Sequence, residues 1–166
     1  MNTPQKLHEQ GVSIWLDFIR RSFVEESGLE DRINQDAVTG VTSNPSIFAS
    51  AIGETNEYDN QLRDLLNNNP EAPPRELYES LAIRDIRSAA DTLRPVYEDT
   101  EGMDGFVSLE VSPDLAHDTD GTIEEARRLW ERVDRPNLLV KVPATQEGIP
   151  AIETLISEGI NVNVTL

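Results

Sequence analysis

The 166-residue chain has no cysteine, so disulfide bonds and thiolate metal sites are both excluded. It also lacks long apolar runs: no segment approaches the ~20 apolar residues that a membrane-spanning helix needs, and the first residues show no apolar run of signal-peptide length. These absences favour a soluble cytoplasmic protein. The length predicts one domain, residues 1–166, large enough for a real hydrophobic core.

Positive charge is scarce as well. Lysine and arginine together number 14 against 31 aspartates and glutamates, which gives a formal net charge of −17. Such a surface repels nucleic acid and anionic membranes, so we expect neither as a partner. The acidic residues are spread along the chain, which indicates solvated helix faces and also suits a salt-rich cytoplasm where ions screen their repulsion.

Lysine occurs only twice, at Lys6 and Lys141, and Lys141 stands inside an apolar stretch. Period-2 alternation places Leu138, Val140 and Val142 on one face of a strand and leaves Lys141 on the other. In a covered strand, desolvation disfavours the ammonium form, and the neutral amine is a nucleophile for carbonyl carbon. The alternative is a lysine near a strand end whose ammonium group reaches water.

Four further segments alternate apolar and polar residues, which is typical of strands with one apolar face. They are residues 12–19, 40–44, 105–113 and 160–166. The first also suits a helix, because it contains apolar pairs at i,i+4 spacing, so local signals leave it undecided. The second is predicted to stop at Asn44-Pro45, since proline disfavours helix for the residue before it. The alternative without a function is a strand that ends in an Asn-Pro turn, which is common.

Helical patterns fill the intervals between these strands. They cover residues 3–10, 20–30, 56–66, 74–97, a segment from residue 122, and 148–158. The helix from Thr122 is predicted to start with a capping box formed by Thr122 and Glu125. Strands that alternate with helices indicate βα units and a parallel sheet.

Each strand nevertheless carries polar residues on its second face, whereas parallel strands covered on both sides are almost entirely apolar. These polar residues are Ser13, Asp17, Thr42, Asn44, Ser108, Glu110, Ser112, Lys141, Asn161, Asn163 and Thr165. Helices can cover only the apolar faces, so the polar faces must converge on an enclosed space such as a barrel interior. Catalytic groups of barrels lie at the carboxyl ends of the strands. The residues at or near such ends are Asp17, Asn44, Glu110, Lys141 and Thr165.

Several motifs resemble those of the transaldolases. Residues 40–47, Gly-Val-Thr-Ser-Asn-Pro-Ser-Ile, resemble the Gly-x-Thr-Thr/Ser-Asn-Pro-Ser signature of that family. Residues 139–148 together with 158–166 resemble the segment around its Schiff-base lysine. Residues 107–111 resemble the strand with its acid/base glutamate, and 13–17 the first strand with its catalytic aspartate. The motifs occur in the family's order, and the resemblance implies that residues 12–19 form a strand.

The resemblance implies catalytic roles for four residues. Lys141 attacks the ketose carbonyl and forms the Schiff base, and Asp17 takes the hydroxyl proton as the carbon–carbon bond breaks. Glu110, with Thr165 and a water molecule between them, shuttles protons while the Schiff base forms and hydrolyses. No metal or cofactor is implied, since the iminium group is itself the electron sink.

It also implies a substrate site and a reaction. Asn44 hydrogen-bonds a hydroxyl of the dihydroxyacetone unit, Thr42 and Ser43 of the same signature lie beside it, and Asn163 gives further support. The implied reaction transfers a dihydroxyacetone unit between sugar phosphates in the non-oxidative pentose phosphate pathway. A homodimer of the full-length protein is left open.

The implied fold is a (β/α)₈ barrel, an α/β fold that takes eight strands and typically about 250 residues. This chain supplies about five strands and stops at Leu166, within a predicted strand, so we expect the N-terminal part of a transaldolase. The phosphate-binding serine and arginine of the family lie beyond that point.

Two alternatives remain at this stage. One is a fructose-6-phosphate aldolase, which releases free dihydroxyacetone; Glu110 favours transaldolase, because the aldolase type more often resembles glutamine there. The other is an inactive half-barrel that acts only by association through its open sheet edges.

Overall fold

The computed structural model describes residues 1–165 and places five strands in one parallel sheet. The strands are β1 (Ile14–Leu16), β2 (Val38–Val41), β3 (Phe106–Glu110), β4 (Leu138–Pro143) and β5 (Val162–Thr165). Their order in the sheet, β1-β2-β3-β4-β5, is their order in the chain. All five predicted strands are therefore confirmed. Strands β1, β3 and β5 have shorter bounds than predicted, and β2 is shifted, since it starts at Val38 and ends at Val41 instead of covering residues 40–44. Leu166 of the last one lies outside the described residues.

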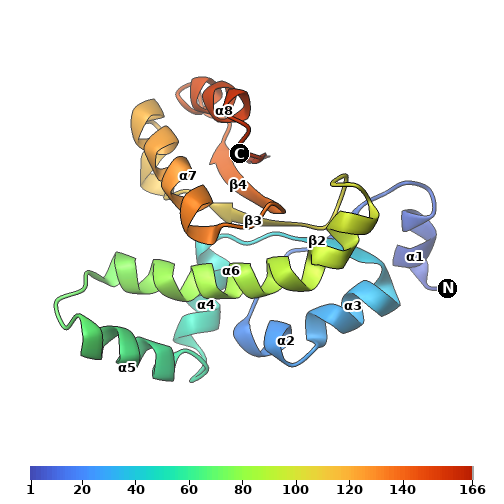
Figure 1. Cartoon of the computed structure of the whole chain (residues 1–166), viewed down its shortest axis with the longest axis horizontal. Helices are drawn as coiled ribbons and strands as arrows, with labels where there is room; N and C mark the ends of the chain where they lie inside the picture. Colours follow the sequence, from blue (N-terminus) through green and yellow to red (C-terminus); the bar gives the residue numbers. More distant parts are fainter. Residues whose placement is uncertain (166) are drawn as a thin grey trace.

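Helices flank the sheet, which curls into a half-barrel (Figure 1). They are α1 (Thr3–His8), α2 (Arg21–Glu25), α3 (Gly28–Asp36), α4 (Pro45–Gly53), α5 (Asp59–Asn68), α6 (Pro74–Asp99), the 3₁₀ helix η1 (Pro113–Leu115), α7 (Thr119–Val133) and α8 (Gly148–Ser157). The long helix α6 runs along the sheet. Helices α7 and α8 pack against each other, and both contact β4. This arrangement agrees with the first part of a (β/α)₈ barrel.

The core lies between the outer faces of the strands and the helices. Val107, Leu109 and Val111 of the β3 segment are buried, as the alternation predicts, and Leu138, Val140 and Val142 of β4 are fully buried. They pack against apolar side chains of α6 and α7 that are also buried: Ile86, Ala89, Leu93, Ala126 and Leu129. Burying one such valine or leucine stabilises the fold by about 1.5–3 kcal/mol, so these two strands anchor the sheet.

Asn44-Pro45 does not form the simple turn that was the alternative for this segment, because helix α4 begins there. The Asn44 side chain accepts a hydrogen bond from the backbone N–H of Ile47 at 2.9 Å and so caps the helix. Pro45 occupies the first helical position, where its missing N–H costs nothing and its fixed φ suits the helix. Strand β2 already ends at Val41, Asn44 is extended as expected for a residue before proline, and the helix starts at Pro45 itself.

The predicted helix over residues 20–30 is two helices. Helix α2 ends at Glu25, Ser27 has a positive φ of 66°, and α3 starts at Gly28. Only glycine fits at position 28, because a Cβ there would come within 2.6 Å of the Phe23 ring. The close packing of α3 on α2 therefore bends the chain at residues 26–28, although the helical pattern of the sequence continues through them.

The predicted capping box at Thr122 was also wrong. Helix α7 starts earlier, and Asp118 caps it by accepting a hydrogen bond from the N–H of Gly121 at 3.0 Å. The Thr122 hydroxyl donates instead to the carbonyl of Leu115, at the end of η1, at 2.9 Å. Glu125 instead reaches the strand end and accepts from the N–H of Ser112 at 2.7 Å.

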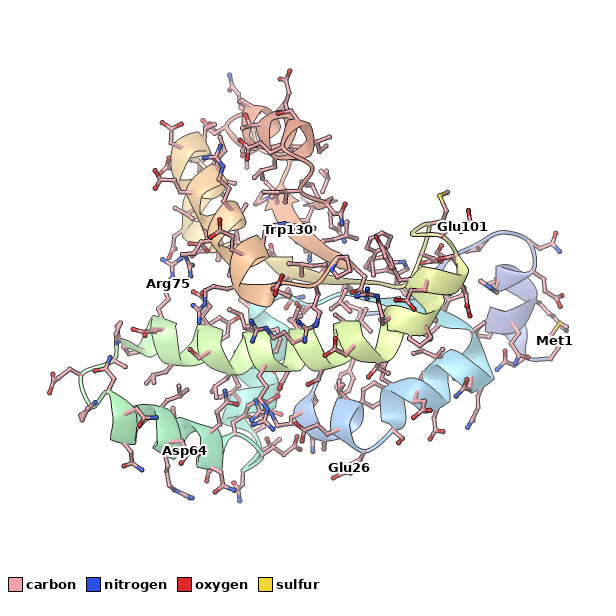
Figure 2. All side chains as sticks on the ribbon, in the orientation of Figure 1. Met1, Glu26, Asp64, Arg75, Glu101 and Trp130 are labelled. Atoms are coloured by element: carbon pink, nitrogen blue, oxygen red, sulfur yellow. The ribbon has the colours of Figure 1, made fainter. Side chains whose placement is uncertain are left out.

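Acidic side chains such as Glu26 and Asp64 project from the helices into solvent, as the charge distribution predicts (Figure 2). In the described part of the chain, no helix is both long enough and apolar enough to cross a bilayer.

Candidate active site

Lys141 and Glu110 face each other on neighbouring strands. The register of β3 and β4 makes their Cα atoms direct partners, so both side chains leave the sheet on the same inner face. The Lys141 ammonium nitrogen lies 3.3 Å from a carboxylate oxygen of Glu110, and the two side chains are only 15% and 16% exposed. An amine and a carboxyl group in this position can exchange a proton directly.

The segment that follows β2 completes the surroundings of this pair. Lys141 Nζ points at the carbonyl oxygen of Ser43 at 3.5 Å. The Ser43 hydroxyl donates to the carbonyl of Ser108 at 2.7 Å, and the Ser108 hydroxyl donates to the Thr42 hydroxyl at 2.9 Å. Ser43 and Ser108 are fully buried, so this network fixes residues 42–43 against β3. The predicted residues Thr42 and Ser43 thus lie beside the lysine.

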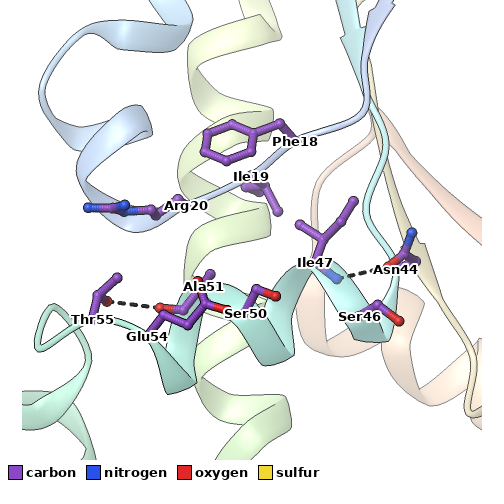
Figure 3. A pocket seen from close by; sticks show the side chains of 10 residues that line it. All are labelled: Phe18, Ile19, Arg20, Asn44, Ser46, Ile47, Ser50, Ala51, Glu54 and Thr55. Atoms are coloured by element: carbon purple, nitrogen blue, oxygen red, sulfur yellow. Dashed lines mark hydrogen bonds between the residues drawn. The ribbon is translucent and has the colours of Figure 1, made fainter.

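Asn44 has a structural function in addition to any contact with a ligand. Its side-chain oxygen caps α4, as the dashed line to Ile47 shows (Figure 3). Within residues 1–165 its amide nitrogen makes no hydrogen bond, so it can donate to an incoming hydroxyl group.

Asn163 and Thr165 are placed on β5 beside the lysine strand. Asn163 is the register partner of Lys141, and Thr165 is the partner of Pro143. The backbone N–H of Ala144 donates to the Thr165 carbonyl at 2.7 Å, which fixes the end of β5 against the end of β4. Both side chains are half-buried on the face that carries Lys141.

Asp17 is exposed and stands apart from this group. It directly follows β1, and strands β2 and β3 lie between it and β4. In the described residues its carboxylate makes no hydrogen bond or ion pair, with Lys141, Glu110 or any other side chain. Its neighbour Leu16 is held in the sheet by a hydrogen bond of 2.9 Å from the N–H of Thr42. The sheet thus places Asp17 at the same end of the strands without bringing it into contact with the pair.

A cavity of about 450 Å³ lies between the segment after β1 and helix α4. One wall carries Phe18 and Arg20, and the other follows α4 from Asn44 at its start to Thr55 beyond its end (Figure 3). Asp17 itself does not line this cavity, although the next residue, Phe18, does.

A second cavity, of about 410 Å³, lies beside Glu110 and is lined by Tyr78 and Glu79 of α6. Burial raises the pKa of Tyr78 to about 12, and the carboxylates of Glu110 and Glu79 add to this effect. Tyr78 could not be predicted near the site, because nothing in the helical pattern of α6 indicates which strand end this residue meets.

No group of three or more histidine, aspartate or glutamate side chains comes together in residues 1–165 in a way that could hold a metal ion.

Comparison with known proteins gives a consistent family. A family model described as transaldolase/fructose-6-phosphate aldolase matches residues 14–166. The chain is 53% identical over 167 residues to a transaldolase of Thermobifida fusca, covering 100% of this chain and 45% of the relative. It is 52% identical over 166 residues to a transaldolase of Thiobacillus denitrificans (100% and 46%). It is 44% identical over 161 residues to Transaldolase 2 of Nostoc punctiforme (97% and 42%). The chain therefore spans less than half the length of these curated relatives.

Proposed function

Because this chain belongs to the transaldolase/fructose-6-phosphate aldolase family, we propose that residues 1–166 form the N-terminal part of a transaldolase barrel domain. The proposed reaction transfers a dihydroxyacetone unit from a ketose phosphate to an aldose phosphate through a Schiff base on Lys141. The observation that supports this most directly is the largely buried Lys141–Glu110 pair at the carboxyl ends of β3 and β4. Assignment to the pentose phosphate pathway, a cytoplasmic location and sugar phosphates as substrates belong to the same proposal and derive from the family.

In the first proposed step the neutral amine of Lys141 attacks the ketose carbonyl carbon, and one proton passes from the attacking nitrogen to the carbonyl oxygen. The resulting hydroxyl group leaves as water when a second proton reaches it, and the iminium forms. Glu110 lies 3.3 Å from the lysine nitrogen and is the proton carrier for this step. Thr165, at the end of the neighbouring strand, acts with Glu110 through a water molecule.

In the second proposed step Asp17 removes the proton from the hydroxyl group on the carbon beyond the bond that breaks. The aldose leaves as an aldehyde, and the bonding electrons move into the iminium to give an enamine on Lys141. The acceptor aldehyde then reacts by the reverse route. Asn44 donates its free amide hydrogens to a hydroxyl of the dihydroxyacetone unit, and Asn163 supports the same unit from β5.

Transaldolase is preferred over fructose-6-phosphate aldolase because the three relatives above are all named transaldolase. The position of Glu110 beside Lys141 agrees with this choice. The two activities differ in one measurement: an aldolase cleaves fructose 6-phosphate without an acceptor aldehyde, whereas a transaldolase needs the acceptor for turnover.

The test requires a completed enzyme, which we define as this chain joined to the C-terminal part of the Thermobifida fusca transaldolase. Incubation with fructose 6-phosphate and borohydride should trap a covalent adduct on Lys141, located by peptide mass spectrometry. Lys141→Ala should abolish it, and Lys141→Arg should do the same because a guanidinium group stays protonated. Lys6→Ala, which replaces the only other lysine of this chain, is the matched control and should still form the adduct. An adduct on Lys6, or none at all, would show that the assignment of Lys141 is wrong.

A further inference from the structure

A buried ion pair lies behind the segment that carries Asp17. Arg21, at the start of α2, donates from Nε to Asp85 of α6 at 2.9 Å, and the two side chains are 6% and 1% exposed. The Tyr58 hydroxyl donates to the second oxygen of Asp85 at 2.8 Å and accepts from the backbone N–H of Arg21 at 3.2 Å. The guanidinium carbon of Arg21 lies 4.3 Å from the centre of the Tyr58 ring. Three distant parts of the chain are joined at this point.

A second connection lies directly beside the first. Glu57 accepts hydrogen bonds from Arg20 Nε at 2.7 Å, from the Ser22 N–H at 2.8 Å and from the Ser22 hydroxyl at 3.0 Å. Burial opposes ionisation of Glu57, but the hydrogen bonds from Arg20 and Ser22 outweigh it and lower the pKa of this carboxyl. Glu57 therefore stays charged and holds the chain on both sides of Arg21.

Stability alone does not account for this arrangement. Burying a charged pair carries a desolvation cost that often equals its attraction, and apolar residues of similar size would serve at least as well. What the charged and hydrogen-bonded groups add is a defined geometry for residues 20–22. The chain just before them is anchored too, because Ile19 is only 1% exposed.

Asp17 lies in the short span between two fixed points. Leu16 is held by the sheet through the N–H of Thr42, and Arg20 is held by Glu57. Only residues 17–19 remain between them, and the last of these is buried in the core. The backbone of Asp17 therefore has little freedom, although its side chain is exposed and forms no hydrogen bond or ion pair within residues 1–165.

We propose that Glu57, Tyr58 and Asp85 are positioning residues for Asp17. They act on carbon–carbon bond cleavage and leave Schiff-base formation unaffected. The inference rests on the proposed function, in which Asp17 is the base for cleavage. In the described part of the chain, none of the three forms a hydrogen bond or ion pair with Lys141 or Glu110, whose positions follow from the β3–β4 register.

The test measures the two steps separately in the completed enzyme. Tyr58→Phe keeps the ring and the direct Arg21–Asp85 ion pair but removes the hydroxyl that links Asp85 to the backbone N–H of Arg21. The rate of aldose release should fall at least about tenfold, since misplacing a catalytic group by about 1 Å can cost ~10²-fold in rate. The rate at which the borohydride-trappable adduct forms should stay at the wild-type value. Glu57→Gln, at the more exposed connection, should likewise slow aldose release and leave the rate of adduct formation at the wild-type value.

Arg84→Gln is the matched control. It removes an exposed ion pair of 2.9 Å between Arg84 of α6 and Glu25 of α2. The variant thus loses one contact between the same two helices but keeps the Arg21–Asp85 pair and the contacts of Glu57. It should change neither rate.

Each other outcome contradicts the proposal. Equal slowing of both steps in Tyr58→Phe and Glu57→Gln would mean a general structural role, and unchanged cleavage would mean no role. If Tyr58→Phe fails to fold, Glu57→Gln decides. Failure of the wild-type enzyme to form any adduct on Lys141 would instead contradict the proposed function, so the two failures are distinguishable.

Discussion

The two halves of the candidate site are positioned by different means. Lys141 and Glu110 stand on adjacent strands, and the backbone register alone sets them side by side. Asp17 follows a strand of three residues, on irregular chain, where no register can fix it. Its position depends on side chains such as Glu57 and Asp85, which belong to other elements.

This difference shows what each kind of site residue needs in order to be held in place. Glu110 and Lys141 need only two strands that pair in sequence order. The segment after β1 needs partners far along the chain: Ser22 and Glu57 are 35 residues apart, and Arg21 and Asp85 are 64 apart. A site residue on a strand is positioned by the sheet that has to form anyway, whereas a site residue on a loop needs dedicated contacts, and these can be altered one at a time.

The largest expected effect comes from leaving out the C-terminal part of the proposed barrel, because both the Lys141–Glu110 pair and Asp17 depend on a closed sheet. In the described sheet, β1 and β5 each have a neighbour on one side only, and Val164 is 54% exposed. Unpaired, uncharged strand edges pair with other chains. We expect the 166-residue chain alone to self-associate or stay loosely packed, with negligible transaldolase activity. Analytical ultracentrifugation and a coupled activity assay measure both properties.

Adding the C-terminal part in trans should restore some cooperativity to thermal unfolding, because it supplies partner strands. A monomeric 166-residue chain that melts sharply and turns over sugar phosphates would contradict this expectation.

The next largest effect separates the two halves by chemistry. In the completed enzyme, Asp17→Asn should slow aldose release while an adduct on Lys141 can still be trapped. Glu110→Gln should slow formation of the adduct itself. General acid–base catalysis typically contributes ~10²–10⁴-fold, so losses of that size are expected in stopped-flow and trapping measurements. Turnover within a few-fold of wild type for both variants would contradict the proton-transfer roles.

The smallest expected effect is a pH dependence of the free energy of unfolding, caused by Glu57 beside the segment that carries Asp17. The pKa of Glu57 in the folded protein is below its ordinary value of 4.5, so the native state binds fewer protons than the unfolded state in this range. The stabilisation by Glu57 is therefore complete above about pH 4.5 and is lost as the pH falls through the lowered value. Urea unfolding of the completed enzyme at pH 7 and at acid pH should show a smaller loss of stability in Glu57→Gln than in wild type.

Arg84→Gln, which leaves Glu57 and its partners in place, should lose as much stability on acidification as the wild type. Equal losses in Glu57→Gln and wild type would show that this carboxylate does not stabilise the fold through its charge.

The placement of Lys141 and Glu110, the site residues on strands, could be predicted from the sequence. Period-2 alternation around Val140 and Leu109 gives the buried faces, and it thereby places Lys141 and Glu110 on the inner face. The alternation is reliable here because β3 and β4 have neighbours on both sides and helices over their outer faces. The role of each residue remains a prediction that the measurements above address.

The helix starts and the contacts behind Asp17 could not be predicted. Asn44 suits a turn and a helix cap equally well by local signals, and only the packing of α4 decides between them. Arg21, Tyr58 and Asp85 carry no local pattern at all, since their meeting depends on how α2 and α6 cross. Such contacts follow from the tertiary fold and not from neighbours in the sequence.

The identity of sheet order and chain order has a consequence for synthesis on the ribosome. Each strand from β2 to β5 pairs with the strand made just before it, so no strand has to wait for a later one to find its neighbour. Loop closure is then limited to one βα unit at a time, which keeps the entropy cost of each step small. The interval between β2 and β3 is the exception, because α4, α5 and α6 must emerge before the next strand can pair. We therefore expect co-translational folding of this chain to pause after β2 and to proceed quickly from β3 onwards, a sequence of events that force measurements on stalled nascent chains can resolve.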